Sequence, residues 1–196
     1  MNLLTQAWIP VRTVDGSRTC VSPAELSRSD LVAFDAVRAD FNGALAQFAI
    51  GLLQTTSPAE SRVAWRRWLK EPPDEAMLRT WFESCETAFE CDGDGARFMQ
   101  DFDLRVGDVQ SVGALLIEAP GESTEKKNGD LFIKRGQVQH LCSHCAMLAL
   151  FTLQLNAPAG GAGNRTSLRG GGPLTTLLVA EPNQSGLGSL WHSLWL

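Results

Sequence analysis

The sequence predicts an α+β fold, with an N-terminal hairpin, several helices, and then short strands around a glycine-rich loop. Apolar residues alternate with a period of two in residues 7–22, and recur with helical spacing between residues 40 and 89. Six glycines gather in residues 157–173, which predicts a loop there. The composition, 44% apolar and 20% charged, is that of a globular domain, here expected to span residues 1–196.

The first expected element is the hairpin over residues 7–22. Its first strand contains Pro10, which predicts a position at the edge of a sheet because proline lacks a backbone N–H. Asp15-Gly16 is a turn signal, since glycine adopts positive φ without steric cost. Ser22-Pro23-Ala24-Glu25 has the pattern of a capping box and should open a short helix.

Three helices are expected next. The first covers residues 40–54, with Asp40 as its N-cap and one apolar stripe formed by Phe41, Leu45, Phe48 and Leu52. The second runs from a capping box at Ser57 to Lys70, and the third from Asp74 to about Phe89. Arg62, Arg66 and Arg67 on the second helix are flanked by acids, which favours an ordinary solvated face.

The charge distribution is uneven. The net charge is −5, which by itself does not indicate a nucleic-acid partner. Residues 126–172 carry a net +5, however, and the remainder of the chain a net −10. A basic segment on an acidic body is typical of a local anion-binding surface, and equally of a solvated basic loop.

Residues 120–136 are expected to form a mobile loop, because they begin with a polar, turn-rich stretch. The loop ends in Leu131–Arg135, where apolar residues precede two bases. Composition favours a buried strand here. The alternative is an exposed loop whose Phe132 stacks on a nucleic-acid base.

The C-terminal part is predicted to contain a buried strand at residues 174–180 and then an apolar segment. We expect this last segment to expose Leu190, Trp191, Leu194 and Trp195. Such exposure is unusual for a complete domain and indicates a fragment, or a subunit that another chain completes.

Cys142 and Cys145 form a Cys-x-x-Cys pair just before an apolar helix expected over residues 146–155. Two thiolates at this spacing are half of a zinc site, which needs two further ligands. A redox dithiol and a pair of buried thiols are the other interpretations. Spacing alone favours the half-site and the buried thiols about equally, and the redox dithiol least, since no thioredoxin-like βαβ setting is evident.

The loop over residues 157–173 fits neither nucleotide-binding glycine motif, because it lacks the Walker lysine and the third Rossmann glycine. Its backbone could approach a ligand such as the DNA minor groove closely, or form a tight structural loop. Its glycines and bases are Gly160, Gly161, Gly163, Arg165 and Arg169. No Ser/His/Asp or Cys/His arrangement is evident, so we do not expect an enzyme.

Several segments together resemble the large subunit of the type I-E CRISPR Cascade complex, the CasA family. The order and approximate spacing of the segments match the N-terminal part of that family over essentially this whole chain. They are Asn2-Leu3-Leu4, Trp8–Arg12, Phe98-Met99-Gln100, the pair Cys142 and Cys145, Ala157-Pro158, Leu168–Thr176 and Leu190–Leu196.

The resemblance implies a non-catalytic subunit of antiviral defence that recognises the PAM on double-stranded DNA and recruits a helicase–nuclease. Gly160, Gly161 and Gly163 match a loop that enters the PAM minor groove, and we expect Arg165 and Arg169 to contact DNA. Phe132, with Ile133 and Lys134, matches a loop that contacts the guide RNA end and another Cascade subunit. This match reverses the preference from composition for a buried Phe132.

The resemblance also implies a structural zinc, held by Cys142, Cys145 and a second cysteine pair beyond residue 196. The chain would then be a truncated N-terminal domain with two of four zinc ligands. No signal peptide and no transmembrane run are evident, which predicts a cytoplasmic protein without a membrane partner. The alternatives are a free-standing zinc-ribbon-like DNA-binding module and a redox or scaffold protein that uses the cysteine pair.

Overall fold

The structure, a computed structural model, describes residues 1–101, 109–157, 167–168 and 188–196. The chain divides into two compact units. Unit 1 comprises Met1–Gln100 together with Thr176–Leu196, and unit 2 comprises Asp101–Thr175. Of the helices that the described residues form, none is long and apolar enough to cross a membrane.

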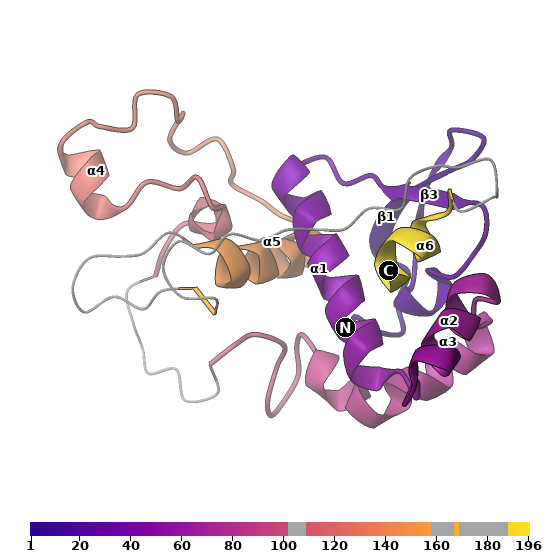
Figure 1. Cartoon of the computed structure of the whole chain (residues 1–196). Helices are drawn as coiled ribbons and strands as arrows, with labels where there is room; N and C mark the ends of the chain where they lie inside the picture. Colours follow the sequence, from indigo (N-terminus) through magenta and orange to yellow (C-terminus); the bar gives the residue numbers. More distant parts are fainter. Residues whose placement is uncertain (102–108, 158–166, 169–187) are drawn as a thin grey trace. The chain divides into compact units, whose positions relative to one another are not determined.

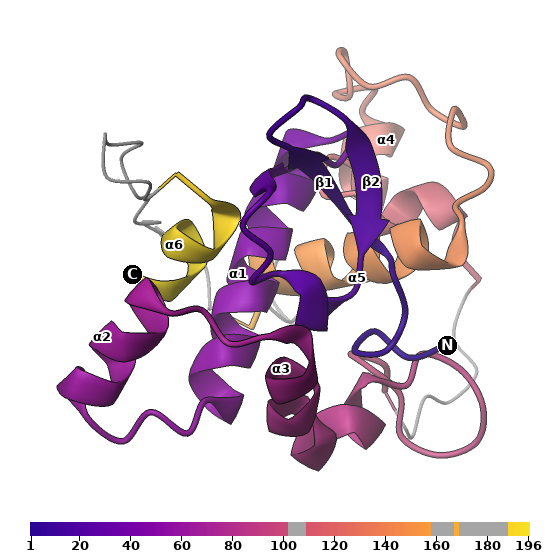
Figure 2. The same cartoon turned by 90° about the vertical axis from the view of Figure 1, so that its right-hand side faces the viewer.

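A three-stranded antiparallel sheet opens unit 1. Its strands are β1 (Ile9–Thr13), β2 (Arg18–Val21) and β3 (Leu31–Phe34), in the order β2-β1-β3. The expected hairpin is therefore confirmed as β1 and β2 (Figure 2). Gly16 has a φ of 84° in the connecting turn, a conformation that favours glycine.

The expectation that Pro10 marks an edge strand is wrong, because β1 is the central strand. It pairs with β2 on one side and with β3 on the other. The Pro10 carbonyl accepts a 2.9 Å hydrogen bond from Asp35 N–H, just past the end of β3. The missing N–H of Pro10 thus falls where the β1–β3 ladder ends.

The helix expected at residues 40–54 is confirmed as α1 (Ala39–Thr56), which lies beside the sheet (Figures 1 and 2). All four residues of its predicted stripe are buried. The N-cap, however, is Arg38 rather than Asp40. Asp40 lies in the first turn and forms a 2.9 Å ion pair with Arg38. The capping box at Ser22 opens the short 3-10 helix η1 (Pro23–Glu25), as expected.

Two further helices follow in unit 1. α2 (Arg62–Lys70) begins at the N-cap Ser61, because the predicted cap Ser57 instead ends α1. α3 (Glu75–Phe82) begins where expected, with the Asp74 side chain accepting a 2.8 Å bond from Met77 N–H. The chain then tightens into the 3-10 helix η2 (Glu83–Phe89) instead of continuing as α-helix.

The C-terminal segment is buried, which corrects the expectation that it is exposed. It forms α6 (Leu190–Trp195), which contacts α1, α2 and β3 within unit 1 (Figure 1). Trp191 and Trp195 are both 0% exposed. The rings of Trp65 and Trp195 stack with their centroids 4.0 Å apart.

Indole hydrogen bonds hold α6 on α2. Trp65 Nε1 donates to the Trp195 carbonyl at 3.0 Å, and Trp195 Nε1 donates to the Trp65 carbonyl at 2.8 Å. Trp191 Nε1 donates to the Trp68 carbonyl at 2.9 Å. The apolar segment is therefore covered by a helix about 120 residues away in sequence, a pairing that sequence periodicity does not report.

Unit 2 has little regular structure in its described residues. It contains the 3-10 helix η3 (Val112–Leu115), the short α4 (Glu122–Lys126) and α5 (Ser143–Asn156). α5 confirms the helix expected at residues 146–155 and begins three residues earlier. The strand predicted at residues 174–180 and most of the glycine-rich loop lie outside the described residues.

Candidate nucleic-acid interface

The loop over residues 120–136 is shaped by its own backbone bonds. It contains the single short helix α4, after which Gly129 N–H donates to the Thr124 carbonyl at 2.9 Å. Asn128 and Gly136 have positive φ angles of 50° and 69°, which let the chain turn back at both places. The loop thus has a defined course rather than the extended strand that composition favoured.

An ion pair between Arg135 and Asp130 closes this loop. Arg135 Nε and Nη2 donate to the two carboxylate oxygens of Asp130, and Nη2 also donates to the Glu125 carbonyl at 3.0 Å. The hydrogen bond from Arg135 holds the pKa of Asp130 below its ordinary value. From the sequence Arg135 is only one of several basic charges, whereas in the structure its side chain holds the loop closed.

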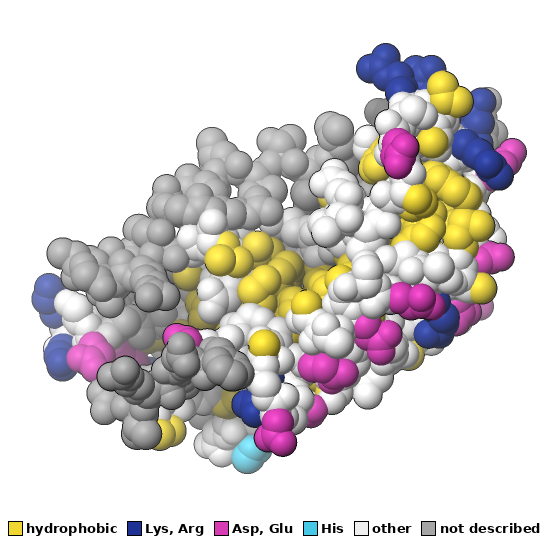
Figure 3. Space-filling model, turned by 90° about the horizontal axis from the view of Figure 1, so that it is seen from below, with side chains coloured by type: hydrophobic (Ala, Val, Ile, Leu, Met, Phe, Trp, Pro, Cys, Tyr) yellow, Lys and Arg dark blue, Asp and Glu magenta, His cyan; other side chains and the backbone are white. Residues whose placement is uncertain are grey.

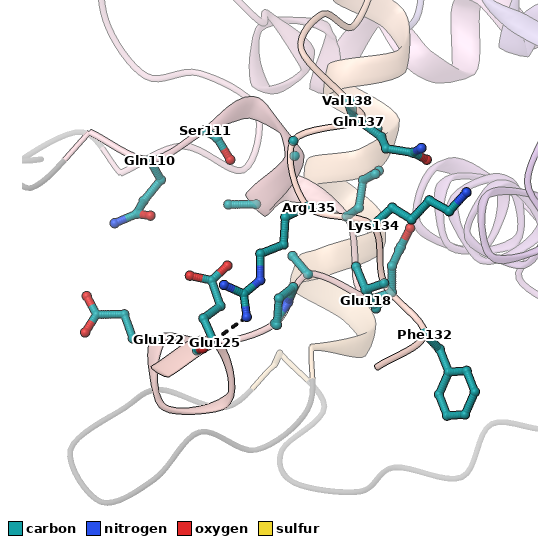
Figure 4. Close-up of a pocket in the computed structure, with 17 residues that line it drawn as sticks. Gln110, Ser111, Glu118, Glu122, Glu125, Phe132, Lys134, Arg135, Gln137 and Val138 are labelled. Carbon is teal, nitrogen blue, oxygen red and sulfur yellow. Dashed lines mark hydrogen bonds between the residues drawn. The ribbon is translucent and has the colours of Figure 1, made fainter. Parts of the chain in front are cut away.

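The closed loop presents Phe132 to solvent. Phe132 is 99% exposed and its neighbour Leu131 is 82% exposed, so the composition-based prediction of a buried strand is wrong. Figure 4 shows the Phe132 ring turned away from Arg135 and from the rest of the loop. Exposure of so large an apolar ring is typical of a contact surface.

Lys134, two residues further along the chain, adds a cation to the same segment, although Figure 4 shows its side chain running away from the Phe132 ring. Its side chain is exposed, and no ion pair joins it to a carboxylate in the part of the chain that the structure describes. Ile133 between them is half-buried, and its N–H donates to the Asp130 carbonyl at 3.1 Å. Phe132 and Lys134 therefore offer a stacking surface and a free ammonium group, while Ile133 anchors the backbone.

A cavity of about 480 Å³ lies beneath this segment, between η3, α4 and the chain from Phe132 to Val138 (Figure 4). This volume is in the range of small-ligand sites. Three carboxylates, those of Glu118, Glu122 and Glu125, line it together with the two bases Lys134 and Arg135. Amide side chains at Gln110 and Gln137 offer both donors and acceptors, which suits a neutral polar group such as a base.

The cysteine pair lies at the start of α5. Cys142 is the N-cap, and its Sγ accepts a 3.2 Å bond from Cys145 N–H. Cys142 is exposed, which argues against the buried-thiol interpretation. Within the described ranges, no group of three or more His, Cys, Asp or Glu residues could hold a metal. Two adjacent thiols on one turn suit a soft metal, but further ligands must come from elsewhere.

The remaining predicted contacts cannot be placed. Gly160, Gly161, Gly163, Arg165 and Arg169 all lie outside the described residues.

Comparison with solved structures shows a shared fold. The chain is 21% identical to Thermobifida fusca Cse1, with a TM-score of 0.64 over 82% of this chain and 30% of that one. It is 19% identical to Thermus thermophilus CasA (Cse1), with a TM-score of 0.61 over 84% and 33%. A chain of a CRISPR RNA-guided surveillance complex matches at 16% identity, with a TM-score of 0.60 over 82% and 35%.

The chain thus spans about a third of the length of these solved chains. The family model for CRISPR-associated protein Cse1 matches residues 2–196, nearly the whole sequence. This match confirms the resemblance carried by the N-terminal, cysteine and C-terminal segments. The chain belongs to the CRISPR-associated Cse1 family.

Proposed function

We propose that this chain is a non-catalytic part of a cytoplasmic, type I-E Cascade complex, in which it contacts the guide RNA end and a neighbouring subunit. The single observation that carries the proposal is the exposed Phe132 on a closed loop, in a chain of the Cse1 family. The shared fold with a solved chain of a CRISPR RNA-guided surveillance complex supports the assembly and its RNA.

The geometry of the loop supports an RNA contact. An aromatic ring and a neighbouring ammonium group suit a stacked base and its phosphate, respectively. The Arg135–Asp130 ion pair fixes the loop, so little conformational entropy is lost when Phe132 is covered. The cavity beneath has the polarity to receive a second, unstacked base.

PAM recognition is the second part of the proposal and rests on the family resemblance. The backbone of Gly160, Gly161 and Gly163 would approach the minor groove of double-stranded DNA, with Arg165 and Arg169 on phosphates. Once bound, the complex would recruit a helicase–nuclease. Cys142 and Cys145 would hold a structural zinc together with two ligands from outside this sequence, and the metal would fix the start of α5.

The RNA contact is tested by substituting Phe132→Ala in the assembled complex. Loss of one stacked base should weaken incorporation of this chain about tenfold, because stacking contributes roughly 1–3 kcal/mol per base. The measurement is the concentration of this chain that half-saturates the remaining subunits with guide RNA.

Leu131→Ala is the matched control, since Leu131 is the adjacent apolar side chain and is also highly exposed. It should leave incorporation unchanged. If both variants incorporate like the original chain, Phe132 is not a contact and the proposed RNA-binding role of this loop is wrong.

A further inference from the structure

A row of basic side chains runs along the outer face of α2. Arg62, Arg66 and Lys70 are spaced four residues apart, so they lie on one side of the helix with a rise of about 6 Å between neighbours. All three are exposed, and the nine-residue helix contains no acidic residue. Figure 3 shows Lys and Arg side chains gathered at the upper right, the corner of unit 1 that α2 occupies.

These three charges are not neutralised. No ion pair involves Arg62, Arg66 or Lys70 anywhere in residues 1–101, 109–157, 167–168 or 188–196. The fourth base of the helix differs, because Arg67 pairs with Glu71 at 3.6 Å and lies over the Trp68 ring. Glu71 therefore neutralises the charge of Arg67 but not the charges of Arg62, Arg66 and Lys70.

The opposite face of α2 holds the row in place. Trp65 stacks on Trp195 of α6, and Trp68 packs edge-on against Trp81 of α3. Three indole-to-carbonyl bonds attach α2 to α6 in the core of unit 1. The backbone that carries the cations is thus fixed before any partner binds, which lowers the entropic cost of binding. The aromatic side chains of α2 are packed inside unit 1, so they are not available for insertion into lipid, as a membrane-surface helix would require.

We propose that the α2 row, defined as Arg62, Arg66 and Lys70, binds the phosphate backbone of double-stranded DNA without reading its sequence. Regularly spaced cations suit a polyanion with regularly spaced phosphates. A protein partner is disfavoured, because protein interfaces are anchored by buried apolar side chains and Val63 is the only exposed apolar side chain of α2. The inference rests on the proposed DNA-binding function and adds a contact surface far in sequence from the glycine-rich loop.

The test is salt-dependent DNA binding by the assembled complex with guide RNA. The variant carries Arg62→Gln, Arg66→Gln and Lys70→Gln together, and the probe is a duplex with a matching target and PAM. Each lost phosphate contact should reduce the magnitude of the negative slope of log K against log salt by about 0.9. The slope of the triple variant should therefore be shallower by about 2–3. The preference for a PAM-containing duplex should stay unchanged, because backbone contacts carry no sequence information.

Arg66→Gln and Arg79→Gln are a matched pair of single substitutions. Arg79 is an exposed base on the neighbouring α3, but it is paired with Glu75 at 2.6 Å. Arg66→Gln should flatten the slope by about 0.9, and Arg79→Gln should leave it unchanged. Thermal unfolding should be the same for all variants, since every substituted side chain is exposed.

Three results would overturn the inference. An unchanged slope for the triple variant removes the α2 row from the DNA contacts while leaving the proposed function intact. Loss of helicase–nuclease recruitment with normal DNA binding assigns the row to an acidic protein surface instead. If the unsubstituted complex binds no DNA, the proposed function itself fails, and the α2 row fails with it.

Discussion

The C-terminal helix α6 of unit 1 and the loop over residues 120–136 of unit 2 place their large apolar side chains in opposite ways. In unit 1, Trp191 and Trp195 are completely buried in a cluster of stacked rings. In unit 2, Leu131 and Phe132 are almost completely exposed on a loop that one ion pair closes. The difference shows that hydrophobicity alone does not determine whether a side chain is buried, since the burial of the two tryptophans depends on partner rings within reach.

The largest effect is expected at Trp195, whose substitution tests whether the buried rings of α6 stabilise unit 1. Trp195→Ala removes the ring that stacks on Trp65 and leaves the Trp65 carbonyl without its donor. We expect the free energy of unfolding to fall by about 3–5 kcal/mol, as for other buried aromatic residues. Urea denaturation followed by far-UV circular dichroism measures the change without relying on tryptophan fluorescence.

Leu196→Ala is the control, because Leu196 is the next residue and is 55% exposed. It should change the free energy of unfolding by no more than about 0.5 kcal/mol. Equal effects of the two substitutions would mean that α6 is not docked in unit 1.

A smaller and local effect is expected in unit 2 from Asp130→Asn. The substitution removes the charge that Arg135 binds, so the loop should open more often, with faster hydrogen exchange at Gly129 and Ile133. The effect should not reach the amides of α1. Exchange at those loop amides that stays as slow as in the unsubstituted chain would show that the ion pair does not close the loop.

Closure of this loop by the Arg135–Asp130 ion pair should weaken at acidic pH. Because its hydrogen bond with Arg135 lowers the pKa of Asp130 from the ordinary 3.8, the ion pair is intact at neutral pH. The contribution of this ion pair to loop closure decreases as the pH falls below 3.8, the ordinary pKa of Asp, and is lost as the pH falls through the lowered pKa of Asp130. In Asp130→Asn no such acid-induced opening should occur, which provides an internal check on the exchange measurement.

The smallest expected effect concerns cysteine reactivity. Burial raises the pKa of the Cys91 thiol in unit 1 to about 11, so at pH 8 it is protonated and shielded. Cys142 at the start of α5 is exposed. Alkylation with iodoacetamide, followed by mass spectrometry, should modify Cys142 well before Cys91; the reverse order would contradict the burial of Cys91.

Local signals in the sequence were reliable. The turn at Asp15-Gly16, the capping box at Ser22 and the Asp74 cap all lie where expected, because each depends on atoms within a few residues. The stripe on α1 was also correct, since helical spacing alone puts its members on one face. The two misassigned caps, Asp40 and Ser57, lie within a few residues of the true caps Arg38 and Ser61, a distance over which competing caps are hard to tell apart from sequence.

The sequence by itself therefore determined the family, the order of most helices and the cysteine pair at the start of α5. Only the tertiary structure decided that β1 is central and that α6 is buried. Both depend on a partner outside the local sequence: β3 beside β1, and Trp65 against Trp195. The exposure of Phe132 differs, because the ion pair that closes its loop is local and the family resemblance already favours an outward ring. Hydrophobic pattern specifies which faces are apolar, whereas long-range packing specifies what covers them.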